Sequence, residues 1–558
     1  MTSYYNLGHY RRDISSSHTE GRKWFNRGLL WNYGFDLEAS RRCFLKAIEA
    51  DPDCAMHYWG LGLSSGIYYN QPWARMLPKE RQSRLADAYD ASRKALDCVD
   101  AASEVEVALI TALATRIQSR EPVDLPVFKA WDDDYADAMR QVYQQFPDDV
   151  DVCTLFADAL VCRTPWKLWD LQTGKPHPKA STGDAITVLE TAINRLETQG
   201  SLPHPGLLHL YIHVMEMSPF PERALPASNA LRELVPDSGH LCHMPSHIDV
   251  RCGHYLDAVL ANNKAIAADN EYLKREGALN FHTLSRIHNY HLKIYAALFL
   301  GQYQSALEAA EELIATTPEQ LLRIEVPAMA DWMEGYMGMK AHVYIRFGKW
   351  QEIIDMPLPE DTALYCMTTA TWRYAKAVAF AASGQVHEAE IESEQFRVAA
   401  SAVPESRTLF NNTCVDVLQI AEQMLEGEIA YRKQQFDIAF AHLRRAVYLD
   451  DNLKYDEPWG WMQPARHALG ALLLEQGHTE EALTVYRADL GLDDTLVSTS
   501  QHHNNIWSLH GYLECLQKTG RVEEAGVIRV QLDEAKQHAD VEVNASCYCR
   551  ILHHCCDT

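Results

Sequence analysis

The sequence predicts an all-α protein, a solenoid of helical hairpins that pack one against the next. Two observations predict this fold. Gly28 and Gly62 lie 34 residues apart in similar surroundings, WFNRG and HYWGLG, and similarity at a fixed period of about 20–50 residues is typical of repeat proteins. Strand-like alternation is nearly absent, whereas a Gly, a short polar turn and an Ala-rich helix recur along the chain. Each hairpin is therefore expected to bury its apolar face against its neighbours.

The first hairpin carries the clearest repeat pattern. Trp24, Gly28, Phe44, Ala47 and Pro52 fall at the spacings of the tetratricopeptide pattern, which predicts a pair of antiparallel helices in each repeat. Later copies are looser but keep the glycine turn, as in GHYLDAV, GQYQSAL, GQVHEAE, GHTEEAL and GRVEEAG. The predicted order is an N-terminal tail (1–16), N-terminal helical repeats (17–200), His-rich central repeats (201–300), C-terminal helical repeats (301–539) and a Cys/His-rich tail (540–558).

Three long irregular connections interrupt the repeats, at residues 70–79, 165–183 and 357–364. Connections of this size with aromatic and Pro residues are often functional. Packed against a groove they would act as a lid, and plain packing is the alternative.

Composition and charge exclude several classes of function. A formal net charge of −25 argues against nucleic-acid and anionic-membrane partners, which need clustered Lys and Arg. The N-terminal segment MTSYYNLGHYRRD has no apolar core of a signal peptide, so we expect a cytoplasmic protein. Most of the 14 cysteines are scattered singly, which favours small buried side chains over a disulfide framework.

Histidines are concentrated in one stretch of the chain. Ten of the 25 fall between residues 204 and 291, where an even spread would place about four. Steps of three or four residues place side chains on one face of a helix, so each segment can direct its imidazoles one way. The segments are HLYIHVME with His209, His213 and Glu216, GHLCHMPSH with His240, His243 and His247, and HNYH with His288 and His291.

The repeat register predicts that these segments converge. Known tetratricopeptide proteins imply that positions 2, 5, 9 and 12 of each first helix line a concave groove. When Ala224, Ala258 and Ala306 are taken as position 20, all eight candidate ligands fall at groove positions. Pro245 would then lie at position 7, where it removes a backbone donor. Alternatively it occupies the first helical turn, with the helix beginning near Met244.

The donor set indicates a transition metal. Neutral imidazoles suit copper, iron, zinc or nickel, and a His-rich set with one carboxylate favours copper or iron over zinc. Either two metals are bound, or one is bound while the remaining His and Glu216 support it and carry protons. The alternative is a groove whose histidines only satisfy backbone groups or bind a peptide.

These segments resemble a large family of bacterial and fungal tetratricopeptide proteins, more distantly similar to tetratricopeptide repeat protein 38. The resemblance covers most of the chain, including DPDCAMHYWGLGL, HLYIHVMEMS, SGHLCHMPSHIDVRCGHYLDAV and YDEPWGWMQPARHALGALLLEQG. It implies an α-solenoid and a cytosolic protein, and it supplies no reaction. Asp249 departs from the family's usual aromatic, and His510 lies at a groove position.

The sequence therefore predicts a metal-dependent oxidoreductase, with copper or iron, acting on a small molecule in the concave groove. Glu216 is the predicted catalytic residue. One alternative is a non-catalytic scaffold that binds a protein or peptide partner, and another is a zinc hydrolase with Glu216 as general base. Tryptophans that could line the pocket or pack in the core are Trp31, Trp59, Trp459, Trp461 and Trp507. The tail residues Cys547, Cys549, His553, His554, Cys555 and Cys556 match no zinc pattern, and a flexible tail with reactive thiols is expected.

Overall fold

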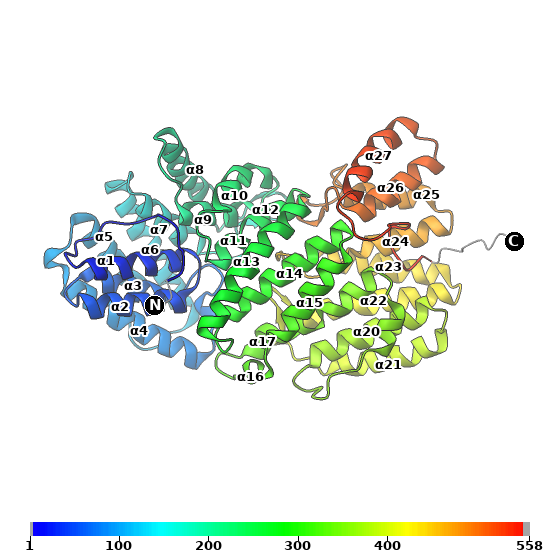
Figure 1. Cartoon of the computed structure of the whole chain (residues 1–558), viewed down its shortest axis with the longest axis horizontal. Helices are drawn as coiled ribbons and strands as arrows, with labels where there is room; N and C mark the ends of the chain where they lie inside the picture. Colours follow the sequence, from blue (N-terminus) through cyan, green and yellow to red (C-terminus); the bar gives the residue numbers. More distant parts are fainter. Residues whose placement is uncertain (1–3, 551–558) are drawn as a thin grey trace. The chain divides into compact units, whose positions relative to one another are not determined.

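The computed structural model describes residues 4–550 as helices joined by turns (Figure 1). The predicted all-α, tetratricopeptide-like hairpin fold is confirmed. In that range the strands form two short antiparallel pairs: β1 (Trp169–Asp170) with β2 (Lys175–Pro176), and β3 (Thr408–Leu409) with β4 (Asn412–Thr413). Among these described residues, no helix is both long and apolar enough to cross a bilayer.

The chain forms two compact units. The first contains residues 1–248 and 264–277, and the second contains residues 249–263 and 278–558. Helices α12 (Pro245–Arg251) and α13 (Tyr255–Glu276) contribute residues to both.

Helices of the first unit pack mainly against their neighbours in sequence, as a repeat array requires (Figure 1). In chain order they are α1 (Thr19–Tyr33), α2 (Leu37–Ala50), α3 (Ala55–Ser65), η1 (Trp73–Arg75), α4 (Pro78–Asp97), η2 (Val99–Ala101), α5 (Glu104–Arg116), α6 (Leu125–Gln145), α7 (Val150–Val161), α8 (Thr182–Thr198), α9 (Pro205–Met215), η3 (Pro221–Ala224), α10 (Leu225–Leu231) and α11 (Gly239–His243).

The repeat glycines are explained by one aromatic ring. Phe44 on α2 is fully buried between α1 and α3. A Cβ atom on Gly28 would lie 2.9 Å from its ring, and one on Gly60 would lie 2.2 Å from it. Gly62, which the period of 34 residues singles out, has ordinary room for a Cβ, with the nearest atoms at 3.4 Å. Close helix packing therefore requires glycine at positions 28 and 60.

The N-terminal segment packs along the first unit, and a buried carboxylate ties it there. Asp151, 2% exposed at the beginning of α7, accepts hydrogen bonds from Tyr10 and Tyr33 and forms an ion pair with Arg12 at 2.8 Å. His204 Nε2 lies 3.2 Å from the same carboxylate. Although burial opposes ionisation, the His204 and Arg12 contacts hold the pKa of Asp151 below its usual range.

The second unit repeats the hairpin theme. Its helices are α14 (His282–Leu300), α15 (Tyr303–Ala315), α16 (Glu319–Leu322), α17 (Met329–Met333), η4 (Glu334–Gly338), α18 (Met339–Arg346), α19 (Trp350–Asp355), α20 (Cys366–Ala382), α21 (Val386–Ser401), α22 (Cys414–Arg432), α23 (Phe436–Asp451), α24 (Ala465–Glu475), α25 (Thr479–Asp489), η5 (Ser498–Ser500), α26 (Ile506–Lys518) and α27 (Val522–Lys536). Tyr486 takes the place of Phe44 here, because Cβ atoms on Gly470 and Gly511 would lie 2.6 and 2.3 Å from its ring.

The predicted glycine turns are present. At these positions the backbone is left-handed, a conformation that glycine adopts without a steric penalty. The glycines are Gly253, Gly301, Gly384, Gly477 and Gly520, with φ between 72° and 82°.

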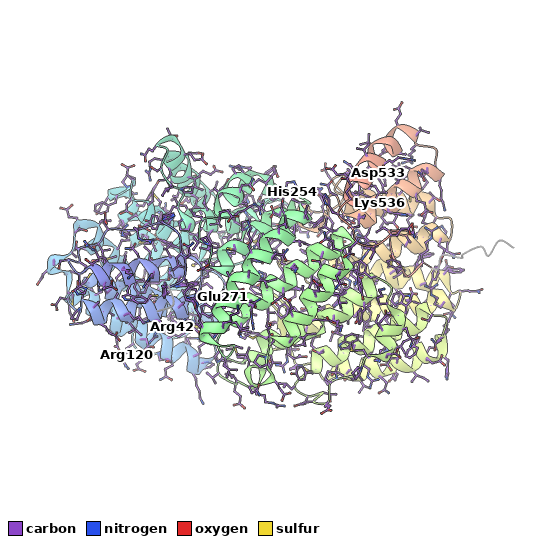
Figure 2. All side chains as sticks on the ribbon, in the orientation of Figure 1. Arg42, Arg120, His254, Glu271, Asp533 and Lys536 are labelled. Atoms are coloured by element: carbon purple, nitrogen blue, oxygen red, sulfur yellow. The ribbon has the colours of Figure 1, made fainter. Side chains whose placement is uncertain are left out.

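Buried aliphatic and aromatic residues form the cores, and charged side chains such as Asp533 and Lys536 of α27 are exposed (Figure 2). All five tryptophans considered as pocket residues are buried: Trp31, Trp59, Trp459, Trp461 and Trp507. The segment 540–550 packs against the second unit, where Asp540 accepts from the backbone N–H groups of Tyr303 and Gln304. This part of the predicted flexible tail is therefore ordered, while His553, His554, Cys555 and Cys556 lie outside the described residues.

Candidate metal centre

Helix α9 carries the first two predicted ligands and is anchored where it begins. The His204 ring accepts a hydrogen bond from the backbone N–H of Leu207 (3.1 Å). Pro205 occupies the first helical turn, where its missing N–H costs little. His209 and His213, one turn apart, therefore project from the same face of the helix.

The second segment is broken at Met244. Helix α11 ends at His243, and Pro245 opens α12. The structure therefore places Pro245 at a helix beginning, the second of the two positions considered from the sequence. His240 and His243 belong to α11, and His247 lies in the first turn of α12.

Three imidazoles of the first unit converge on one point: His209, His213 and His240, called here the histidine triad. One ring nitrogen from each lies within 4.8 Å of the corresponding nitrogens of the other two. His209 Nδ1 donates to the carbonyl oxygen of Tyr33 (2.6 Å), which leaves its Nε2 facing His240 Nε2 at 3.2 Å. His213 Nε2 is buried and has no hydrogen-bond partner among the described residues.

Glu216 holds two imidazoles at once. Its Oε1 accepts from His213 Nδ1 (2.9 Å), and its Oε2 accepts from His247 Nδ1 (2.6 Å). A proton fixed on Nδ1 leaves the lone pair on Nε2, the nitrogen available to a metal. His247 Nε2 in turn lies 2.7 Å from His243 Nε2. The first unit thus brings together five of the seven predicted histidines and Glu216.

The cluster is buried. His209, His213 and Glu216 are 0% exposed and His240 is 7% exposed, so these groups lie in the interior, whereas the register predicted that they line a concave groove. Burial lowers the pKa of His213 to about 3 and that of His209 well below its usual range. Both rings are therefore neutral at physiological pH, which is the form that binds metal.

Aromatic rings from three loops cover the triad. The ring centroid of Phe35, in the turn between α1 and α2, lies 4.3 to 5.6 Å from those of all three imidazoles. Tyr69, in the loop between α3 and η1, and Trp166, in the irregular connection 165–183, lie with their ring centroids 5.0 and 5.9 Å from that of His213. Phe35 and Trp166 both have positive φ, 58° and 61°, and such strained residues concentrate at functional sites.

His288 and His291 belong to α14 of the second unit and have partners there. The His288 ring stacks on Phe410 with centroids 5.2 Å apart. His291 Nε2 lies 2.9 Å from the sulfur of Met462, and burial lowers the pKa of His291 to about 3.

Sequence reasoning missed the residues that orient the triad. The carbonyl of Tyr33 and the ring of Phe35 reach it from the first hairpin, far away in sequence, and a backbone carbonyl leaves no signature in a sequence. Phe35 follows Gly34 in a short turn between two helices, and this turn is the one local signal available. Asp151 and His204 do not contact the triad but hold residues that do: Asp151 accepts from the Tyr33 hydroxyl, and His204 accepts from the backbone at the beginning of α9.

Comparison with known proteins gives no family and only weak structural likeness. No protein-family model and no curated protein sequence matches the chain. Solved structures similar to it include Ypp1 (8% identity, 95% of this chain and 89% of that one, TM-score 0.45) and yeast Tom70 (13% identity, 92% and 91%, TM-score 0.26). Another is Naa15/Naa10 bound to HypK-THB (12% identity, 93% and 72%, TM-score 0.21).

Proposed function

We propose that the first unit binds a transition-metal ion through the Nε2 atoms of His209, His213 and His240. The observation that carries the proposal is the buried Nε2 of His213, which faces its triad partners while its own Nδ1 is held by Glu216. A buried polar atom without a partner is costly, and a metal ion would satisfy it.

The spacing supports the same assignment. Two imidazole nitrogens bound to one tetrahedral ion at about 2.0–2.1 Å stand roughly 3.3–3.4 Å apart. The 3.2 Å between His209 Nε2 and His240 Nε2 is close to that separation. The carbonyl of Tyr33 and the carboxylate of Glu216 orient His209 and His213 from behind, as outer partners do in metal sites.

The burial of the site favours a stabilising role in a helical-repeat scaffold. The metal would join the helices that carry the triad, α9 and α11, beneath the turn that carries Phe35, and no ligand reaches an open groove. In this role the protein binds a protein or peptide partner through its repeats, and the metal fixes the shape of the first unit. A cytoplasmic location and the finer resemblance to the bacterial and fungal family are part of this proposal.

A second candidate is an oxidoreductase that uses copper or iron and a small molecule. The donor set favours it: the ligands are neutral nitrogens, as copper and iron sites accept. Glu216 would then position His213 and His247 and hold their protons at Nδ1. Zinc hydrolysis has weaker support, because both oxygens of Glu216 already accept from imidazoles and are poorly placed to act as a general base.

Metal analysis of the full chain, purified without added metal and after loading, tests the centre. We expect at least about half an equivalent of one transition metal in the parent protein. His213→Ala should remove most of it with helical circular dichroism unchanged, while His387→Ala, at an exposed position on α21, should retain it. A parent protein that holds no metal after loading would overturn the proposal.

The two roles differ in what metal removal does. If the metal is structural, a chelator should lower the melting temperature and leave no spectral response to O2 in the holoprotein. If it is a redox centre, the absorption spectrum of the reduced holoprotein should change on exposure to O2. A metal that does neither would contradict both roles.

A further inference from the structure

A small cavity in the second unit is lined by two thiols and a buried arginine. About 40 Å³ of this cavity is accessible to water-sized molecules, which is enough for two or three of them. Apolar and aromatic side chains form most of its wall, and the polar groups come from α18, α22, α24, the loop before α24 and the segment that follows α27. These polar lining residues are Arg346, Glu428, Gln463, His467, Cys547 and Cys549.

Within residues 4–550, Arg346 is a buried cation without a carboxylate partner. It is 4% exposed, its Nη1 lies 3.0 Å from His467 Nδ1, and its Nη2 donates to the carbonyl of Ser546 (2.9 Å). Its Nε has no hydrogen-bond partner, and it forms no ion pair with a carboxylate, among the described residues. Burial lowers the pKa of Arg346 to about 10, and the neighbouring thiols oppose that shift. A buried guanidinium of this kind favours an anion beside it.

Cys547 and Cys549 are held together in a tight turn. The Arg550 N–H donates to the Cys547 carbonyl (3.2 Å), which makes the two cysteines residues i and i+2 of a β-turn. The Cys549 backbone N–H donates to Cys547 Sγ (3.4 Å). Arg432 donates to the Cys549 carbonyl, which fixes the turn against α22.

The two thiols differ in character. Cys547 is half-buried and Cys549 is 6% exposed, so a reactant reaches Cys547 more readily. The hydrogen bond from Cys549 lowers the pKa of Cys547 against the opposing effect of burial, and Arg346 adds to the lowering. Burial raises the pKa of Cys549 well above its usual range. Cys547 is thus the more exposed and the more acidic of the two thiols.

We propose that Cys547 and Cys549 are a redox-active pair oxidised by small hydroperoxides, with Cys547 as the attacking thiolate opposite Arg346 and Cys549 as the resolving thiol. The geometry matches redox-sensing cysteines, in which an accessible thiolate stands beside a second thiol. The size of the cavity restricts the oxidant to molecules such as hydrogen peroxide. This assignment is independent of the metal centre, which belongs to the first unit.

The reaction balances in two steps. The Cys547 sulfur attacks the terminal oxygen of the hydroperoxide, the O–O bond breaks, and the leaving alkoxide takes the proton that Cys547 lost on ionisation. Cys547 becomes a sulfenic acid. The Cys549 sulfur then attacks the Cys547 sulfur, the S–O bond breaks, and hydroxide leaves with the Cys549 proton as water. Two thiols are oxidised to a disulfide, and the hydroperoxide is reduced to an alcohol and water.

Peptide mass spectrometry of the reduced full chain, treated with one equivalent of hydrogen peroxide, tests the pair. We expect the Cys547–Cys549 peptide to lose two hydrogens and dithiothreitol to restore them. Cys549→Ser should leave a sulfenic acid at Cys547 that dimedone traps, and Cys547→Ser should abolish oxidation of the pair. Cys98→Ser, at a half-buried thiol after α4, is the control and should change neither result.

Alkylation rates test the role of Arg346. Arg346→Met should slow alkylation of Cys547 by iodoacetamide at pH 7 by roughly tenfold, since one unit of pKa changes the thiolate fraction about that much. An unchanged rate with native circular dichroism would overturn the pairing. So would a parent chain in which peroxide oxidises Cys98 as fast as Cys547. Zinc bound at the pair without any peroxide oxidation would assign a soft-metal site in its place.

The cysteines beyond residue 550 are a further control. The double variant Cys555→Ser with Cys556→Ser should still form the Cys547–Cys549 disulfide at the parental rate. Loss of the disulfide in that variant would mean that Cys549 is not the resolving thiol.

Discussion

Glu216→Gln should weaken metal binding without removing a ligand. In the parent, the two carboxylate oxygens accept from His213 Nδ1 and His247 Nδ1. A glutamine offers one oxygen and one NH2 group in the same space, so only one imidazole can keep its donor contact. If His213 faces the NH2 group, it must turn its Nδ1 into an acceptor and place its proton on Nε2, where that proton blocks the metal.

The magnitude follows from this change of tautomer. Loss of an outer hydrogen-bond partner typically costs about 10–100-fold in metal affinity, or roughly 1.4–2.7 kcal/mol. The lost contact was charge-assisted and fully buried, which places the expected effect at the upper end of that range. His213→Ala removes the ligand itself and should therefore cost more than Glu216→Gln.

Competition against a chromophoric chelator measures both affinities, with Glu222→Gln as the matched control at an exposed position in η3, which follows α9. Glu216→Gln should raise the dissociation constant, and Glu222→Gln should leave it at the parental value. An affinity of Glu216→Gln within about twofold of the parent would refute the positioning role. Complete loss of metal, equal to that of His213→Ala, would make Glu216 a ligand.

Three further predictions concern stability. Gly60→Ala places a methyl group 2.2 Å from a buried atom of the Phe44 ring and should lower the free energy of unfolding by about 1–3 kcal/mol in urea titrations. Gly62→Ala, whose methyl group has 3.4 Å available, should change that free energy by less than about 1 kcal/mol. Equal effects would contradict the contact of Gly60 with the Phe44 ring. Folding lowers the pKa of His213, so below pH 6.5 the metal-free unfolded chain binds more protons than the folded chain. The free energy of unfolding should therefore fall by up to about 1.4 kcal/mol per pH unit from pH 6.5 toward pH 3. If His213→Phe shows the same fall in stability, this residue is excluded as its cause. Asp151→Asn removes the anion from a buried ion pair and should lower the free energy of unfolding by about 3 kcal/mol, against less than about 0.5 kcal/mol for the exposed Asp148→Asn. Equal melting temperatures of the two variants would refute the stabilising role of Asp151.

Local spacing predicted the fold and much of the candidate site because both depend on helix periodicity. His209 and His213 share a face of α9 as a step of four residues requires, and Glu216 follows within one turn. The glycine turns were visible for the same reason, since a left-handed helix end needs glycine. The period of 34 residues found the repeat but selected Gly62, because a period carries no information about which glycine faces the Phe44 ring.

The burial of the site could not be predicted from the repeat register. The register places a side chain on a helix face and leaves open what covers that face. Here Phe35, Tyr69 and Trp166 come from loops outside the helices that carry the triad, and they close it off. The thiol pair was missed for a related reason. Cys547 and Cys549 match no ligand spacing, and their chemistry depends on Arg346, which lies about 200 residues earlier in the sequence.

Burial also couples the metal centre to the packing of the first unit. The Tyr33 hydroxyl donates to Asp151 and the Tyr33 carbonyl accepts from His209, so one residue connects the buried carboxylate of Asp151 to the triad. Asp151 contacts His204, whose ring caps the helix that carries His209 and His213. A metal that binds the native triad more tightly than the unfolded chain therefore stabilises these contacts by the same free energy, through linkage. It follows that Asp151→Asn should lower metal affinity although Asp151 is not a ligand, while Gly511→Ala, a packing variant of the second unit, should lower stability and leave the affinity unchanged. Titration of both variants with metal, under conditions where each is folded, would separate this coupling from a general loss of structure.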